Sequence, residues 1–134
     1  MVVDTNVFSA VLGSDPMGLF SLYQRHLSGK AILISFQTAA EVRYGALAAG
    51  WGSRRMAQLE LKLSRAILVP PHEDLIIEAA RLRHDCKKVG HGLQSGNHAG
   101  DLWIAATARL GDVPLVTHDK IFDGAPGLTV IREP

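Results

Sequence analysis

Four acidic residues of this chain stand where carboxylates could act together on one reaction: Asp4, Glu41, Asp101 and Asp119. Asp4 and Asp119 follow short apolar runs, whereas Glu41 and Asp101 lie near the starts of segments with helical periodicity. Carboxylates repel one another unless a cation joins them, and oxygen-only ligands favour a hard ion. The set therefore predicts a site for Mg²⁺ or Mn²⁺.

Such a site suits the hydrolysis of phosphodiester bonds. A bound divalent ion lowers the pKa of a coordinated water, orients it for in-line attack and offsets charge on the departing oxygen. No side-chain nucleophile is required. We expect Asp4 and Asp101 to be direct ligands, and Asp119 and Glu41 to act through water or as general bases.

The segments that must position these acids follow an α/β pattern. Short apolar runs of strand length alternate with longer amphipathic segments, which is typical of a parallel sheet flanked by helices. The expected five strands are Met1–Asp4, Ala31–Ser35, Ala66–Pro70, Pro114–Thr117 and Leu128–Ile131. The whole chain, residues 1–134, then forms a single domain.

Helices are expected between these strands. Capping and stop signals place them from Ser14-Asp15-Pro16 to about Ser28, over Gln37–Ala49, from Ser53 to about Ala66, over Glu73–Lys88 and from Asp101 to Gly111. The stretch Gly90–Gly100 has four glycines and predicts a mobile loop.

This framework brings the acids to one edge, because catalytic groups of open parallel sheets collect beyond the carboxyl ends of the strands. Asp4 ends the first strand, and Asp119 lies two residues beyond Thr117 at the end of the fourth. Glu41 lies early in the helix that leaves the second strand. Asp101 continues the apolar stripe of its own helix, so its carboxylate is expected to point inward.

Each acid also has an ordinary structural explanation. Asp4 could bond its own backbone in a turn, Asp101 could cap a helix, and Asp119 could cap a loop. Glu41 could be a solvated helix residue. Four acids at one edge of one sheet favour the metal site over four separate coincidences.

Composition agrees with a small globular protein, and the formal net charge of +1 by itself favours no particular partner. The chain is 47% hydrophobic and 20% charged, and its single cysteine, Cys86, excludes an internal disulfide framework. No leader or long apolar span is recognised, so we expect a cytoplasmic protein without a membrane segment. If four of the 13 acids bind metal, the remaining nine face 14 lysines and arginines, an excess that suits nucleic acid.

The motifs around these acids resemble those of PIN domains. In chain order they are Val3–Val7, Glu41–Gly45, Asp101–Ala106 and Leu115–Asp119, and the tail Phe122–Val130 is similar to the closing strand of the family. Each motif alone is weak evidence, but the order and spacing of all four are specific and extend over essentially the whole chain. The stretch Lys87–Gly100, with His91 and His98, matches no pattern of the family.

The resemblance implies a function as well as a fold. VapC-type PIN domains are Mg²⁺- or Mn²⁺-dependent endoribonucleases, the toxins of bacterial toxin–antitoxin pairs, usually dimeric and inhibited by a small VapB-type antitoxin. It therefore implies an RNA substrate, such an antitoxin and a homodimer. Asp4, Glu41, Asp101 and Asp119 match the acidic quartet of the family, while Asn6 and Thr117 match polar neighbours that order the site. Asn6 could equally be a plain turn former.

Three other functions would require different sequence features or leave the site without activity. A phosphorylated receiver module would need adjacent acids after the first strand and a lysine after the last, and neither is present. A DNA flap nuclease would need more acids and added substrate-binding elements. A non-catalytic PIN-like RNA-binding or regulatory module remains the main alternative, because a fold can persist without activity.

Overall fold

A five-stranded parallel sheet forms the centre of the computed structural model, which describes residues 1–134. The strand order is β3-β2-β1-β4-β5, and every neighbouring pair is parallel. The strands are β1 (Val2–Val3), β2 (Leu33–Ser35), β3 (Ile67–Val69), β4 (Leu115–Val116) and β5 (Val130–Ile131). The predicted α/β fold with five parallel strands is confirmed.

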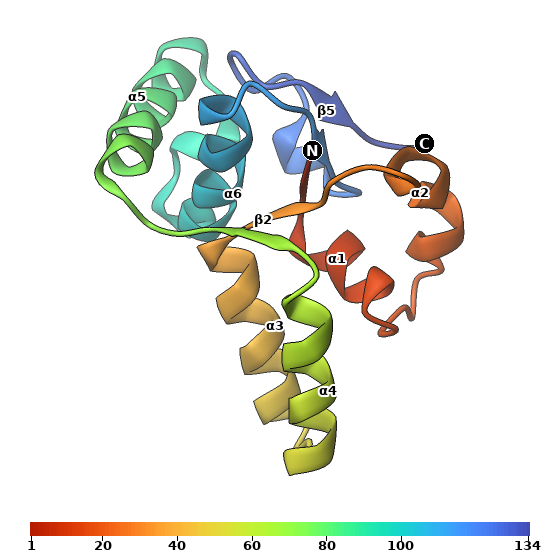
Figure 1. The fold of residues 1–134 in the computed structure, drawn as a ribbon. Helices are drawn as coiled ribbons and strands as arrows, with labels where there is room; N and C mark the ends of the chain where they lie inside the picture. Colours follow the sequence, from red (N-terminus) through yellow and green to blue (C-terminus); the bar gives the residue numbers. More distant parts are fainter.

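Helices cover both faces of the sheet (Figure 1). They are α1 (Thr5–Val11), α2 (Leu19–Leu27), α3 (Phe36–Ala48), α4 (Ser53–Leu63), α5 (Glu73–Val89) and α6 (Ala99–Leu110), with short 3₁₀ helices η1 (Gly92–Gln94), η2 (Gly96–His98) and η3 (Lys120–Phe122). Helices α3 and α4 project together away from the sheet, as Figure 1 shows. No helix is long and apolar enough to cross a membrane.

The core consists of two apolar clusters, one on each face. Alternate side chains of a strand point to opposite faces, so Val3 and Val116 join the cluster of α1 to α4, whereas Val2 and Leu115 join that of α5 and α6. The expected inward stripes are present: Leu59 and Leu63 of α4 are buried in the first cluster. Leu75, Ala79, Leu82 and Cys86 of α5 are buried in the second.

Three segments differ from the prediction. The helix expected from Ser14-Asp15-Pro16 begins only at Leu19, with Gly18 as its N-cap. Thr5–Val11 forms a helix that was not expected, because seven residues give too short a periodic pattern to recognise. The predicted mobile loop Gly90–Gly100 is instead folded into η1, η2 and the start of α6. Leu93 explains this difference, since it is fully buried in the second cluster and anchors a stretch that its glycines had marked as a loop.

Candidate active site at the carboxyl edge of the sheet

The candidate site lies where the order in which strands are added to the sheet reverses. Successive strands run from β1 through β2 to β3 on one side, and β4 and β5 lie on the other side of β1. Between β1 and β4 the strand order reverses, and open parallel sheets usually bind ligands at the carboxyl ends of the strands at such a point. Asp4 directly follows β1, and Thr117 directly follows β4.

Asp4 is the buried centre of this edge. Its residue is 4% exposed, and its carboxylate accepts hydrogen bonds from the backbone N–H of Val7, at 3.0 Å, and from the hydroxyl of Thr117. Burial raises the pKa of Asp4 to about 6, and the negative charges of Asp119 and Asp101 add to that rise. The hydrogen bonds from Thr117 and Val7 oppose it. The site therefore carries negative charge that the protein does not fully compensate.

The local role that we considered for Asp4 is also real, because Asp4 is the N-cap of α1. A capping aspartate has one oxygen on a backbone N–H, here that of Val7, and this contact fixes the orientation of its carboxylate. The cap and the predicted ligand role are compatible, since a carboxylate has more acceptor positions than these two hydrogen bonds occupy.

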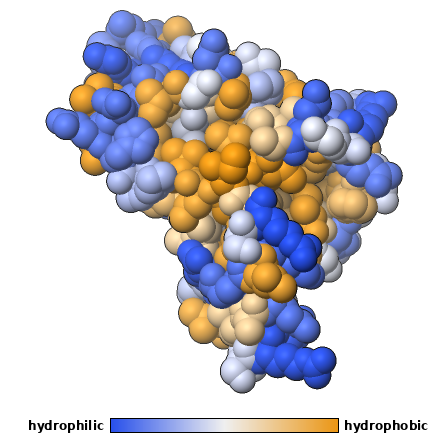
Figure 2. All heavy atoms as spheres, in the orientation of Figure 1, coloured by the Kyte–Doolittle hydropathy of each residue, from blue (hydrophilic) through white to orange (hydrophobic).

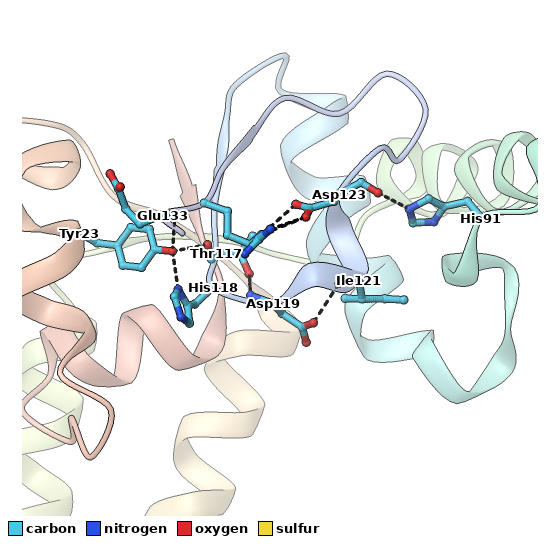
Figure 3. A network of polar contacts seen from close by, with 9 residues as sticks. Tyr23, His91, Thr117, His118, Asp119, Ile121, Asp123 and Glu133 are labelled. Carbon is cyan, nitrogen blue, oxygen red and sulfur yellow. Dashed lines mark hydrogen bonds and ion pairs between the residues drawn. The ribbon is translucent and has the colours of Figure 1, made fainter.

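Thr117 connects Asp4 to Asp119. Its fully buried hydroxyl donates to Asp4 and accepts from the backbone N–H of Asp119 at 3.0 Å. The side chain of Asp119 is solvent-exposed and accepts from the backbone N–H of Ile121 at 3.0 Å, so it caps η3 (Figure 3). Thr117 therefore contacts two of the four predicted acids, and its role in ordering the site remains a prediction.

Glu41 reaches the same edge from α3. The hydroxyl of Thr5, the residue after Asp4, donates to Glu41 Oε2, and Gln37 Nε2 donates to Oε1 at 2.8 Å. A Cβ atom on Gly100 would lie 3.3 Å from Glu41 Oε1, so the absence of a side chain at Gly100 lets α6 approach α3 closely here.

Asp101 lies in the first turn of α6, directly after Gly100, and is half-buried. It is not the N-cap of this helix. Its Oδ2 lies 2.9 Å from Nδ1 of His98, a histidine to which the sequence had assigned no role. Its negative charge adds slightly to the raised pKa of Asp4. The predicted inward orientation remains a prediction, since the side chain is 32% exposed and contacts His98.

Three of these contacts were missed at the sequence level. Gln37 precedes Glu41 by four residues, the spacing at which helical side chains meet, so this pair had a readable signal. His98 precedes Asp101 by three residues, so this pair also had a local signal. Thr5 had none, since its contact depends on how α1 and α3 are packed. Asn6 is exposed on α1, and its ordering role remains a prediction.

The donor set fits a hard divalent cation in its chemistry. All the predicted ligands are carboxylates, and burial, the main cause of the raised pKa of Asp4, disfavours a negative charge that a cation would stabilise. However, no three histidine, cysteine, aspartate or glutamate side chains are close enough together to form a metal-binding group. Glu41, Asp101 and Asp119 contact protein partners instead, so a bound ion would require these side chains to reorient.

A second polar network contacts the segment Thr117–His118 at this edge (Figure 3). The buried Tyr23 hydroxyl lies 2.9 Å from the carbonyl oxygen of Thr117 and 2.8 Å from Nδ1 of His118, and it accepts from the backbone N–H of Glu133 at 2.9 Å. The Glu133 carboxylate in turn pairs with Arg25 and His26. These contacts join α2 and the last residues to the segment that holds Thr117 and Asp119.

The fold and the site can now be compared with known proteins. A family model described as the PIN domain matches residues 1–128. The chain belongs to the PIN domain family. This PIN domain is of the VapC type, because it is 31% identical to Ribonuclease VapC5 of Mycobacterium tuberculosis over 98% of its own length and 93% of that protein.

Solved structures agree with this assignment. A crystal structure of VapBC-5, from the VapBC family of toxin–antitoxin systems of Mycobacterium tuberculosis, matches with a TM-score of 0.68 and 30% identity, covering 98% of this PIN domain and 97% of that chain. VapBC-1 of nontypeable Haemophilus influenzae matches with a TM-score of 0.71 and 26% identity, covering 98% and 96% of the two chains.

Proposed function

We propose that this PIN domain is a Mg²⁺- or Mn²⁺-dependent endoribonuclease and the toxin of a cytoplasmic toxin–antitoxin pair. The main observation behind the proposal is the buried carboxylate of Asp4 at the carboxyl end of β1, whose pKa is raised further by the negative charges of Asp119 and Asp101. Evolutionary similarity to proteins named Ribonuclease VapC supports RNA as the substrate.

Each site residue has a proposed role that follows from its surroundings. Asp4 and Asp101 would hold the cation directly, with Asp119 and Glu41 acting through water or as general bases. When bound, the cation would supply positive charge for the scissile phosphate and acidity for the attacking water. Thr117 and the Val7 N–H keep the Asp4 carboxylate in one orientation. The exposed carboxylate of Asp119 is accessible to solvent, where it can accept a proton.

The proposal includes two protein partners. The solved relatives described above are VapBC systems, which supports a VapB-type antitoxin for this chain. A homodimer is supported by apolar surface on the edge strand β3, where Ile67 and Leu68 are 55% and 46% exposed. Figure 2 shows apolar residues gathered in the middle of the face that the segment between α4 and α5 crosses.

The decisive experiment is cleavage of total bacterial RNA by the purified chain with Mg²⁺. The native chain should give discrete products, whereas Asp4→Asn should lower the rate by about 100-fold or more, the loss typical of a group that stabilises transition-state charge. Asp74→Asn is the matched control, because it removes an exposed acid at the start of α5 and should leave the rate unchanged. A chelator or Ca²⁺ should stop turnover.

Two outcomes would contradict the proposal. Equal cleavage by the native chain and Asp4→Asn would remove the catalytic assignment. RNA binding without any cleavage, in Mg²⁺ and in Mn²⁺, would favour the non-catalytic RNA-binding alternative.

A further inference from the structure

An open groove lies beside the candidate active site, between the end of α1 and the projecting helices α3 and α4. Its volume is about 570 Å³. Residues from all three elements line it, among them Ser9 of α1, Glu41 and Gly45 of α3, and Arg55 and Lys62 of α4. Nothing lies within 4 Å of the position that a Cβ of Gly45 would take, so the wall on α3 is open at this residue.

The groove is continuous with the candidate site through Glu41. This side chain lines the groove and also accepts a hydrogen bond from Thr5, the residue next to Asp4. A linear molecule lying in the groove would therefore have one end beside the carboxylates.

The charge of the groove is positive. Arg55 and Lys62 are its basic lining residues, and its single acid is Glu41, which belongs to the candidate metal site. Neither Arg55 nor Lys62 forms an ion pair, in contrast with Arg43 on the same pair of helices, which is paired with Glu60. Lys62 donates one hydrogen bond to the carbonyl oxygen of Leu12, and its ammonium group has further donors.

Arg55 is held in a defined orientation by an aromatic ring. Its guanidinium carbon lies over the Trp51 ring, 4.0 Å from the ring centroid, in a cation–π contact. Trp51 is half-buried and packs against the apolar core, so the ring is a rigid support. Arg55 is exposed, and its planar guanidinium can therefore present its second face to a ligand.

We propose that this groove binds the single-stranded part of the RNA substrate, with one nucleobase stacked on Arg55 and a nearby phosphate contacting Lys62. The inference rests on the proposed function, since it names where the same substrate lies. Arginine planes and aromatic rings stack unpaired bases, whereas paired bases of a duplex cannot reach such a platform. The positive lining favours RNA over an apolar peptide, and the stacking surface of Arg55 and the path to the carboxylates favour it over an acidic peptide.

The test measures binding in the Asp4→Asn background, where the RNA remains intact. Fluorescence anisotropy follows a labelled single-stranded RNA of about ten nucleotides, within the usual range of single-strand sites. Arg55→Ala should weaken binding by about 5- to 100-fold, as expected for the loss of one stacked base. Arg54→Ala is the matched control: it removes the same charge from the neighbouring position outside the groove and should change the Kd by less than about threefold.

Arg55→Lys separates stacking from charge. It keeps the positive charge but loses the planar face, so its Kd should resemble that of Arg55→Ala. Circular dichroism and thermal melts of each variant verify that α4 is intact. If Arg55→Ala binds RNA like its parent, the proposal is wrong, and the groove is left to a protein partner. Equal effects of Arg54→Ala and Arg55→Ala would also overturn it, because they would show general electrostatic attraction.

The result is distinguishable from that of the cleavage experiment. If Asp4→Asn abolishes cleavage but Arg55→Ala cleaves and binds RNA normally, the proposed function stands and only the groove assignment fails. If the native chain does not cleave RNA but binding still depends on Arg55, the proposed function fails and the groove assignment stands.

Discussion

The edge at β1 and β4 and the groove beside α4 differ in the burial and the pairing of their charged residues. At the edge, the carboxylate of Asp4 is buried, hydrogen-bonded by Val7 and Thr117, and its pKa is raised to about 6. In the groove, Arg55 is exposed and rests on a ring without an ionic partner. Burial raises the free energy of a charged side chain and fixes its orientation, which suits catalysis. Exposure leaves a charged side chain accessible to a long substrate.

The largest expected effect on stability tests whether the buried charge of Asp4 lowers the free energy of unfolding. In the metal-free chain Asp4→Asn should raise the free energy of unfolding at pH 8 by as much as about 3 kcal/mol, the equivalent of the rise of its pKa from 3.8 to about 6. The folded state binds the proton more tightly than the unfolded state, so this group lowers the stability of the native chain as pH rises from about 4 through 6.

Urea denaturation with a chelator, at pH 4 and pH 8, measures this effect. At pH 4 the two proteins should differ little, since Asp4 is then mostly protonated in the folded state. A gain of equal size at both pH values, or a loss at pH 8, would contradict the buried-charge interpretation. Asp74→Asn should show no comparable gain at pH 8, because Asp74 is exposed.

The next effect tests whether Thr117 orders the edge. Thr117→Val should lower the free energy of unfolding by about 1–3 kcal/mol, because the buried Asp4 carboxylate and the N–H of Asp119 both lose a partner. The matched control is Thr107→Val in α6, whose buried hydroxyl only donates to the carbonyl oxygen of Trp103 four residues before it. Equal losses in the two variants would show that Thr117 has no special role at the site.

The smallest effect concerns the exposed side of the projecting helices. Arg43 of α3 contacts Glu60 of α4 through two hydrogen bonds of 2.8 and 2.9 Å, but both side chains are largely exposed. A double-mutant cycle with Arg43→Ala and Glu60→Ala should give a coupling energy below about 1 kcal/mol that decreases with added salt. A larger, salt-independent coupling would mean that ionic contacts, not the buried Leu59 and Leu63, hold α4 against the protein.

Much of the fold was readable because the signals were local. The apolar strand runs and the helical stripes of α4 and α5 predicted elements that the structure shows, and their alternation predicted a parallel sheet, although not its strand order. The prediction was wrong for Gly90–Gly100. Glycine content is a local signal for a loop, whereas the burial of Leu93 depends on α5 and α6, which pack around it.

The candidate site could also be predicted only in part. The placement of Asp4 and Asp119 at one edge follows from parallel strands, and the motifs around the four acids matched the family. The contacts of Glu41 with Gln37 and of Asp101 with His98 join residues four and three positions apart, so their spacing was visible in the sequence. The hydrogen bond from Thr5 to Glu41 was not, because it joins α1 to α3 and depends on how these helices pack.

The sequence by itself determined which chemistry is available, namely four carboxylates spaced so that parallel strands and their helices carry them to one edge. Only the tertiary structure decided how those groups behave. The raised pKa of Asp4 comes from burial and from the charges of Asp101 and Asp119, which lie far from it in the sequence. The groove of Arg55 likewise exists only because α1, α3 and α4 meet around it. Residue type is a property of the chain, but burial and proximity are properties of the packed fold.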